Sequence, residues 1–155
     1  MKALAENKKA FFDYELLEKI EAGLVLYGHE VKSIKTGHVS LKGSYVTFKL
    51  SSKPGKLPEA YLINAHIPLY KFSNQKLPHD PLRSRKLLIK KSEIKHLMGK
   101  KQEQGLTLVP LKIYTVRGLI KLEFALAKGR KKHDKREVIK KRELDRKIRT
   151  LTRNK

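Results

Sequence analysis

Six histidines, at positions 29, 38, 66, 79, 96 and 133, are the first residues of this chain that suggest chemistry. No two of them stand three or four residues apart, and the sequence has no cysteine, so the spacing does not favour a metal site. His79 and Asp80 are adjacent, but an aspartate before a proline, here Pro81, is typical of a turn. No serine or glycine motif of a nucleophile or phosphate loop is present. We therefore expect no metal, no cofactor and no enzymatic activity.

Positive charge is the chemistry that the sequence does offer. The chain has 37 Lys or Arg against 15 Asp or Glu, and the net charge is +22. Residues 128–155 hold 14 basic and 4 acidic residues, so this tail carries +10 and residues 1–127 carry +12. A nucleic acid, a membrane surface and an acidic protein are candidate partners. Nucleic acid is favoured, because basic segments that bind lipid usually add Trp, Phe or Leu on one helix face.

Two segments of the body concentrate this chemistry. In residues 83–91, five cations surround the apolar run 87–89, which suits phosphates and one aliphatic side chain packed on an unstacked base. A solvated strand edge is the alternative interpretation. In residues 21–35, the acidic Glu21 precedes a basic helix edge, and it is able to accept a hydrogen bond from a base or a ribose. A plain strand, turn and helix would give the same pattern. The candidate RNA-binding residues are Glu21, Lys32, Lys35, Arg83, Arg85, Lys86, Leu88 and Lys90.

The tail is too polar to fold alone, because its few apolar residues cannot offset the conformational entropy of ordering it. We expect residues 129–155 to be disordered in the free protein and to become helical from about Asp134 on a polyanion. A compact block begins the tail, in which His133 is able to stack on a base while the cations bind phosphates. Its candidate binding residues are Lys128, Arg130, Lys131, Lys132, His133, Asp134, Lys135 and Arg136.

The elements that must position these residues are mostly strands. The best predicted strands are residues 107–116 and 119–128, which Arg117-Gly118 joins in a tight turn, and apolar residues alternate with period two in the second of them. The other predicted strands are residues 11–26, 45–50, 61–67 and 86–89. Helices are predicted at residues 30–35, closed by Gly37, and from Ser92 to about Gly105.

We therefore predict a mainly β protein with flanking helices (α+β). Its five or six strands would form a small closed antiparallel barrel, because closure removes the sheet edges, with two or three helices around it. The expected organisation is a flexible leader at 1–9, an RNA-binding domain at 10–128 and the basic tail at 129–155. No apolar run is long enough to span a membrane and no signal peptide is evident, so we expect a soluble, cytoplasmic protein.

Short motifs in a fixed order along nearly the whole chain resemble those of the SsrA-binding proteins, also called small protein B. The matching stretches are Asp13-Tyr14, residues 21–35, Ser44-Tyr45, His79-Asp80-Pro81 with Arg83 and residues 85–88, residues 107–112, and residues 127–136. Each motif is weak alone, but their order and spacing are specific.

The resemblance implies an oligonucleotide-binding-like barrel that binds the tRNA-like domain of transfer-messenger RNA (tmRNA), with Glu21 and Leu88 at the contact. It also implies a tail that enters the empty mRNA channel of a stalled ribosome near the decoding centre, and a complex with elongation factor Tu. Position 90 departs from the family, which has His or Asn where this chain has Lys90. The segment 53–59 is longer than is usual in the family.

Two other classes fit parts of the sequence. A structural ribosomal protein with a barrel head and a basic extension would share the charge distribution, and stoichiometric cofractionation with one ribosomal subunit would reveal it. A small nuclease would need a carboxylate cluster, which the sequence lacks.

Overall fold

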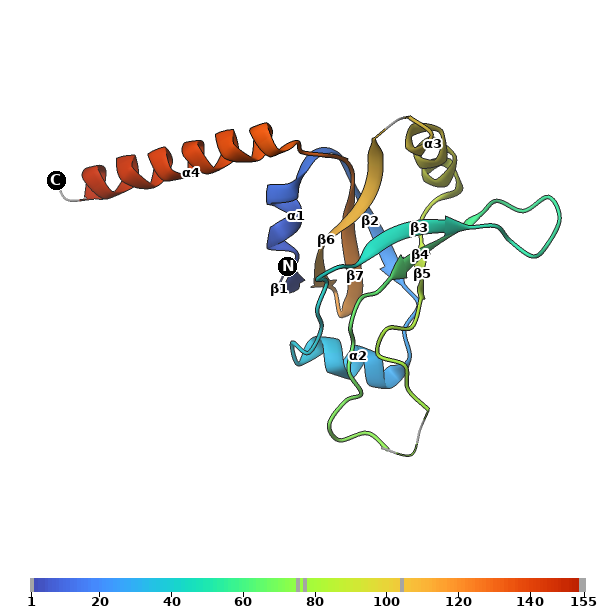
Figure 1. Cartoon of the computed structure of the whole chain (residues 1–155). Coiled ribbons are helices and arrows are strands. Elements are labelled where there is room, and N and C mark those ends of the chain that lie inside the picture. The colour runs from blue at the N-terminus through green and yellow to red at the C-terminus, as the bar shows by residue number, and fades with distance from the viewer. Residues whose placement is uncertain (1, 75, 77, 104, 154–155) are drawn as a thin grey trace.

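The computed structural model describes residues 2–74, 76, 78–103 and 105–153. In this part of the chain there are seven strands and four helices (Figure 1). The strands are β1 (Lys2–Glu6), β2 (Tyr14–Leu24), β3 (Tyr45–Lys49), β4 (Glu59–Ile63), β5 (Arg85–Leu88), β6 (Leu106–Val116) and β7 (Leu119–Gly129). The helices are α1 (Lys8–Asp13), α2 (Gly28–Lys35), α3 (Lys91–Lys101) and α4 (Lys132–Arg153).

The strands make one antiparallel sheet in the order β1-β6-β3-β4-β5-β2-β7. The last strand of this order, β7, also pairs with β6, from Leu106↔Lys128 to Val116↔Leu119. The long strands β2 and β7 pair from Tyr14↔Gly129 to Gly23↔Lys121. The antiparallel sheet and its flanking helices confirm the predicted fold class at this level.

The main hydrophobic core lies on the inner face of the sheet. Alternate residues of β2 and β7 are buried there, as the period of two requires: Ile20, Ala22, Leu122, Phe124 and Leu126. Ile34 of α2 and Leu97 of α3 are fully buried in the same core. Each such side chain contributes about 1.5–3 kcal/mol through burial, so the core holds both helices against the sheet.

Helix α1 covers part of the opposite, outer face. Its Ala10 lies in a second apolar cluster with Val109 and Leu111 of β6 and with Ala125 and Ala127 of β7. Small side chains let the helix approach the strands closely. The remaining outer face of β2, beyond this cluster, is left open to solvent.

Turn chemistry agrees with the sequence at two places. Arg117 and Gly118, which connect β6 to β7, both have positive φ, at 50° and 80°. A two-residue hairpin turn of type I′ needs this conformation at both positions. Gly37, with φ of 85°, follows the end of α2, where a left-handed residue commonly closes a helix.

The N-terminal segment differs from the prediction. Residues 1–9 were expected to be a flexible leader, but β1 pairs with β6, and α1 begins at Lys8. Asn7 links the two elements. Its backbone amide donates to the Leu111 carbonyl at 2.7 Å, and its side-chain Nδ2 donates to the Pro110 carbonyl at 3.0 Å. The strand predicted at residues 11–26 is correspondingly shorter, because α1 occupies its first part and β2 begins at Tyr14.

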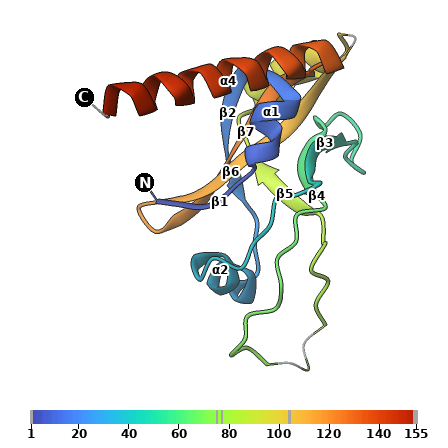
Figure 2. The ribbon, with the colours of Figure 1, turned by 60° about the vertical axis from the view of Figure 1, so that its left-hand side comes forward.

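The tail forms α4, which projects from the body in both views of the ribbon (Figures 1 and 2). No residue of α4 is buried. It contacts the body at α1: Lys135 Nζ is 3.3 Å from Asp13 Oδ1, and the guanidinium carbon of Arg142 lies 5.8 Å from the centre of the Phe12 ring. Just before α4, the Arg130 amide donates to the Asp13 carbonyl at 2.8 Å. Neither α4 nor another helix of the described residues is apolar over a length that could cross a membrane. Disorder of the tail in the free protein stays a prediction.

Candidate nucleic-acid interface

Glu21 stands on the outer face of β2, with its side chain about half exposed. The Tyr114 hydroxyl donates a hydrogen bond to Oε2 of Glu21, and Lys121 Nζ is 3.9 Å from Oε1. Burial raises the pKa of Tyr114, and the hydrogen bond to Glu21 raises it further, so the phenol remains a donor. These contacts orient the carboxylate and leave it free to accept more hydrogen bonds, as recognition of a base edge or ribose requires.

Leu88 lies beside Glu21 and is unusually exposed for a leucine in a strand, at 56%. It ends β5, directly opposite Gly23 of β2. A Cβ atom on Gly23 would lie 3.3 Å from Leu88 Cβ and 3.6 Å from Leu88 Cδ1. The missing side chain of Gly23 thus lets Leu88 lie over β2, two residues from Glu21. An apolar side chain and an oriented acceptor are thus only two residues apart along β2.

The exposed face of β2 continues beyond Glu21 into the residues that follow the strand. Odd-numbered positions from Glu21 to Tyr27 point outward, while Ala22, Leu24 and Leu26 contact the core. Val25 and Tyr27 are exposed at 45% and 57%. Neither was singled out from the sequence, although the alternation of apolar residues from position 20 to 26 was a signal that could have revealed them. Glu21, Val25 and Tyr27 therefore form an exposed stripe that runs from β2 into the segment before α2.

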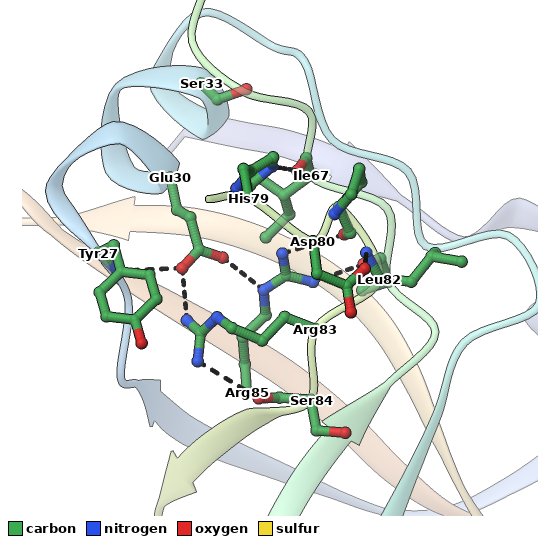
Figure 3. Close-up of polar contacts among 12 residues, drawn as sticks. Tyr27, Glu30, Ser33, Ile67, His79, Asp80, Leu82, Arg83, Ser84 and Arg85 are labelled. Carbon is green, nitrogen blue, oxygen red and sulfur yellow. Dashed lines mark hydrogen bonds and ion pairs between the residues drawn. The ribbon is translucent and has the colours of Figure 1, made fainter. Parts of the chain in front are cut away.

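A buried ion-pair cluster, Glu30 with Arg83 and Arg85, supports the end of this stripe (Figure 3). Glu30 is fully buried in the first turn of α2. Arg83 Nη2 donates to its Oε1, and Arg85 Nε donates to its Oε2 at 2.5 Å. The Tyr27 backbone amide donates the third hydrogen bond to this carboxylate, to Oε1 at 3.1 Å. The cluster thus ties α2 to the segment that leads into β5.

Opposing influences act on the pKa of Glu30. Burial, the largest of them, raises this pKa, but the hydrogen bonds from Arg83, the Tyr27 amide and Arg85 together outweigh it. The pKa therefore lies below its ordinary value, and the carboxylate is ionised at neutral pH.

Arg85 was predicted to bind RNA, but the structure places it in the protein interior. Its side chain is fully buried, and it donates to Glu30, to the Ala65 carbonyl at 2.6 Å and to the Pro81 carbonyl at 3.0 Å. A guanidinium so enclosed does not reach a phosphate. Arg83, two residues earlier, keeps 27% of its side chain exposed, and its guanidinium carbon lies 4.3 Å from the centre of the Tyr27 ring.

The other predicted cations are on the surface but on different elements. Lys86 Nζ is 2.8 Å from Glu59 Oε1, and this hydrogen bond raises the pKa of Lys86. Lys90 is exposed directly before α3. Lys32 and Lys35 are exposed on α2, at the end of the molecule away from α4 (Figures 1 and 2). The structure therefore groups Glu21, Lys86, Leu88 and Lys90 near β5, and places the α2 lysines apart.

The predicted tail residues surround the start of α4. Lys128 is exposed at the end of β7, and the Lys131 amide donates to Asp134 Oδ2 at 3.2 Å, which caps the helix. His133 is among the exposed residues, with its Nε2 3.4 Å from Glu137 Oε1. Lys135 contacts Asp13. The cations of this block, and the histidine, face solvent in or beside the first turn.

The described residues hold no group of three or more His, Cys, Asp or Glu side chains that could bind a metal ion. An antiparallel sheet with an oriented carboxylate, an exposed leucine and a strongly basic helical extension is the arrangement of a nucleic-acid-binding protein.

The comparison with known proteins identifies the family. A family model described as SmpB protein matches residues 4–154. The SsrA-binding protein of Thermosipho africanus (strain TCF52B) is 50% identical over 149 residues, which cover 96% of this chain and 95% of that protein. The SsrA-binding protein of Trichormus variabilis (strain ATCC 29413 / PCC 7937) is 46% identical, with 99% and 94% covered. The chain therefore belongs to the SmpB family.

A solved structure agrees with this assignment. A chain of the structure described as "tmRNA-SmpB: a journey to the center of the bacterial ribosome" is similar to this chain with a TM-score of 0.64 and 42% sequence identity. The match covers 86% of this chain and 92% of that one. The family that the sequence motifs resemble is thus confirmed.

Proposed function

We propose that this protein is an RNA-binding adaptor of trans-translation, which binds the tRNA-like domain of tmRNA and delivers it to stalled ribosomes. Membership of the SmpB family and the solved tmRNA–SmpB structure support this function. The structural observation that carries it is the pair of Glu21 and Leu88, an oriented acceptor beside an exposed apolar side chain on a cationic protein.

The body, residues 10–128, is the RNA-binding domain in this proposal. Six strands, β2 to β7, would form a closed oligonucleotide-binding-like barrel, an inference that rests on the pairing of β7 with both β2 and β6. The RNA-binding residues that we retain are Glu21, Lys32, Lys35, Arg83, Lys86, Leu88 and Lys90. Lys90 serves as a phosphate contact, because an ammonium neither stacks nor offers an amide fork.

The tail, residues 129–155, binds the ribosome. Its basic block from Lys128 to Arg136 meets the small-subunit decoding centre, and α4 follows the empty mRNA channel. The charge of α4 and its lack of buried residues support this role, since most of its surface is free for ribosomal RNA. The adaptor acts in the cytoplasm, together with elongation factor Tu.

Sequencing the RNA that copurifies with the protein tests the function directly. We expect one dominant tmRNA. Stoichiometric cofractionation with a single ribosomal subunit in unstressed cells, without tmRNA, would instead identify a structural ribosomal protein.

The affinity for the tRNA-like domain is expected to fall steeply with salt. If the protein neutralises about 4–6 phosphates, the slope of log K against log salt concentration is roughly −3 to −5, because each contact releases counterions. Fluorescence anisotropy of the labelled RNA domain over a series of KCl concentrations measures the slope. A flat salt response would contradict the proposed backbone contacts.

Glu21→Ala and Leu88→Ala are each expected to weaken binding of the tRNA-like domain by about 10-fold or more. Removing a negative charge would strengthen a purely electrostatic contact with RNA, so weaker binding by Glu21→Ala reveals a specific hydrogen bond. Glu15→Ala is the matched control, because it removes the same charge from an exposed position of β2.

Glu21→Gln separates this role from a structural one, since it keeps an acceptor for the Tyr114 hydroxyl. We expect it to fold normally and to bind RNA less well than the unsubstituted protein. A folded Glu21→Ala protein that binds as well as Glu15→Ala would exclude Glu21 from the interface.

A further inference from the structure

A groove of about 600 Å³ opens beside Leu88, between three elements. One wall is the end of the β3–β4 connection, residues 55–58, and the opposite wall is the first turn of α3. The floor is β5 and the residue that follows it, Ile89. This volume lies within the range of about 300–1,000 Å³ that is typical of small-molecule sites. No role for the groove follows from the sequence motifs.

The groove has an apolar interior. Leu57 and Pro58 from the connection face Leu88 and Ile89 from the strand, and Ile94 of α3 completes the lining. All are at least partly exposed, and Leu88 is the most open of them. Apolar side chains that line a hollow without filling it leave room for a flat, weakly polar group.

The rim of the groove is cationic. Lys56, Lys91 and Lys95 line it, and in the described part of the chain no ion pair involves any of the three. Glu59 is the acidic member of the lining, and it is already paired with Lys86 at 2.8 Å. The occupant that suits this rim carries negative charge on either side of an apolar centre.

We propose that this groove binds an unstacked nucleobase of the RNA, with the flanking phosphates on Lys56, Lys91 and Lys95. Apolar side chains pack against the π-face of any base, and lysines neutralise the backbone without reading sequence. Leu88 is part of the groove lining, so an RNA strand that lies on Glu21 and Leu88 reaches the groove directly. This inference rests on the proposed function and extends its RNA site toward α3 and the β3–β4 connection.

Leu57→Glu tests the proposal, because it places a carboxylate in the groove at a loop position outside the main core. We expect the full-length variant to bind the tRNA-like domain of tmRNA about 10-fold or more weakly than the unsubstituted protein. Leu17→Glu is the matched control: the same change at an exposed leucine of β2, six residues before Gly23 and outside the groove lining, is expected to have a much smaller effect.

Methyl NMR of the unsubstituted protein gives a second measurement that does not depend on a variant folding. Titration with the tRNA-like RNA is expected to shift the methyl signals of Leu57 and Ile94 together with that of Leu88. Equal affinities of the two glutamate variants, or a shift of Leu88 without Leu57 and Ile94, would overturn the groove while leaving the Glu21–Leu88 contact standing. If Leu57→Glu keeps its RNA affinity but loses binding to the ribosome or to a protein factor, the nucleobase proposal is also wrong and the groove binds a protein.

Discussion

Replacing Glu30 by alanine is expected to lower the free energy of unfolding by about 3–5 kcal/mol, because removing one partner of a buried ion pair leaves an uncompensated charge. Arg85 would stay in the core without its carboxylate, and α2 would lose its tie to the segment before β5. Urea denaturation followed by circular dichroism measures the change. Glu59→Ala is the matched control, since its pair with Lys86 is partly exposed and should matter little.

The pH dependence of stability gives an independent check on Glu30. Its pKa in the folded protein is lowered, so its contribution is complete above the ordinary glutamate value of 4.5 and is lost as the pH falls through the folded value. The stability difference between the unsubstituted protein and Glu30→Gln is therefore expected to be largest at neutral pH and to shrink below about pH 4.5. A constant difference from pH 7 to pH 3 would show that Glu30 is not ionised in the cluster.

The long elements were predictable because their periodicity is strong. β6 and β7 have eleven residues each, apolar and charged residues alternate in the first half of β7, and the Arg117-Gly118 turn leaves one register for the hairpin. The short N-terminal elements were not, because β1 has five residues and α1 has six. What stabilises them is tertiary: β1 pairs with β6, and Asn7 hydrogen-bonds to β6 carbonyls more than 100 positions away.

The sequence predicted the candidate binding residues from their types, but residue type does not show which of them are exposed and which are buried. Arg83 and Arg85 stand in one basic run, and nothing local distinguishes them. Both pair with Glu30, a residue of α2 more than 50 positions earlier, but only Arg85 is completely buried. Similarly, the motifs predicted a role for Glu21, but its orientation by Tyr114 depends on a hydrogen bond between residues 93 positions apart. Long-range pairing of polar groups is the information that a local pattern lacks.

The positions of the proposed RNA site and of the tail explain why we expect the body and the tail to act independently. The proposed RNA contact at Glu21 and Leu88 and the adjoining groove lie on β2, β5 and α3, whereas the tail contacts α1. The contacts of α4 with the body are an ion pair from Lys135 to Asp13 and the approach of Arg142 to the Phe12 ring, at 5.8 Å. Neither residue of the body belongs to the RNA site. We therefore expect RNA binding and ribosome binding to respond independently to substitution.

Ending the chain after Arg130 is expected to abolish tagging of stalled products while leaving the tRNA-like domain bound. The shortened protein keeps all of β7 and the hydrogen bond from the Arg130 amide to the Asp13 carbonyl, so the body should fold as before. At physiological salt the RNA affinity should fall by less than about 10-fold, because the retained site supplies the specific contacts and distant charges are screened. Tagging in a reconstituted translation system and anisotropy with the RNA domain measure the two effects.

The reason for the loss of tagging lies in α4 itself. This helix carries ten Lys or Arg and four Asp or Glu, and it buries no residue. Without RNA phosphates its positive charges repel one another, and its few contacts with α1 add little stability. The helix should therefore be unprotected in amide hydrogen exchange of the free full-length protein. On the ribosome the same amides should become protected, since the phosphates that line the channel neutralise the helix. A shortened protein that still tags stalled products would refute the role of the tail. Strong protection of residues 138–151 in the free protein would refute its disorder.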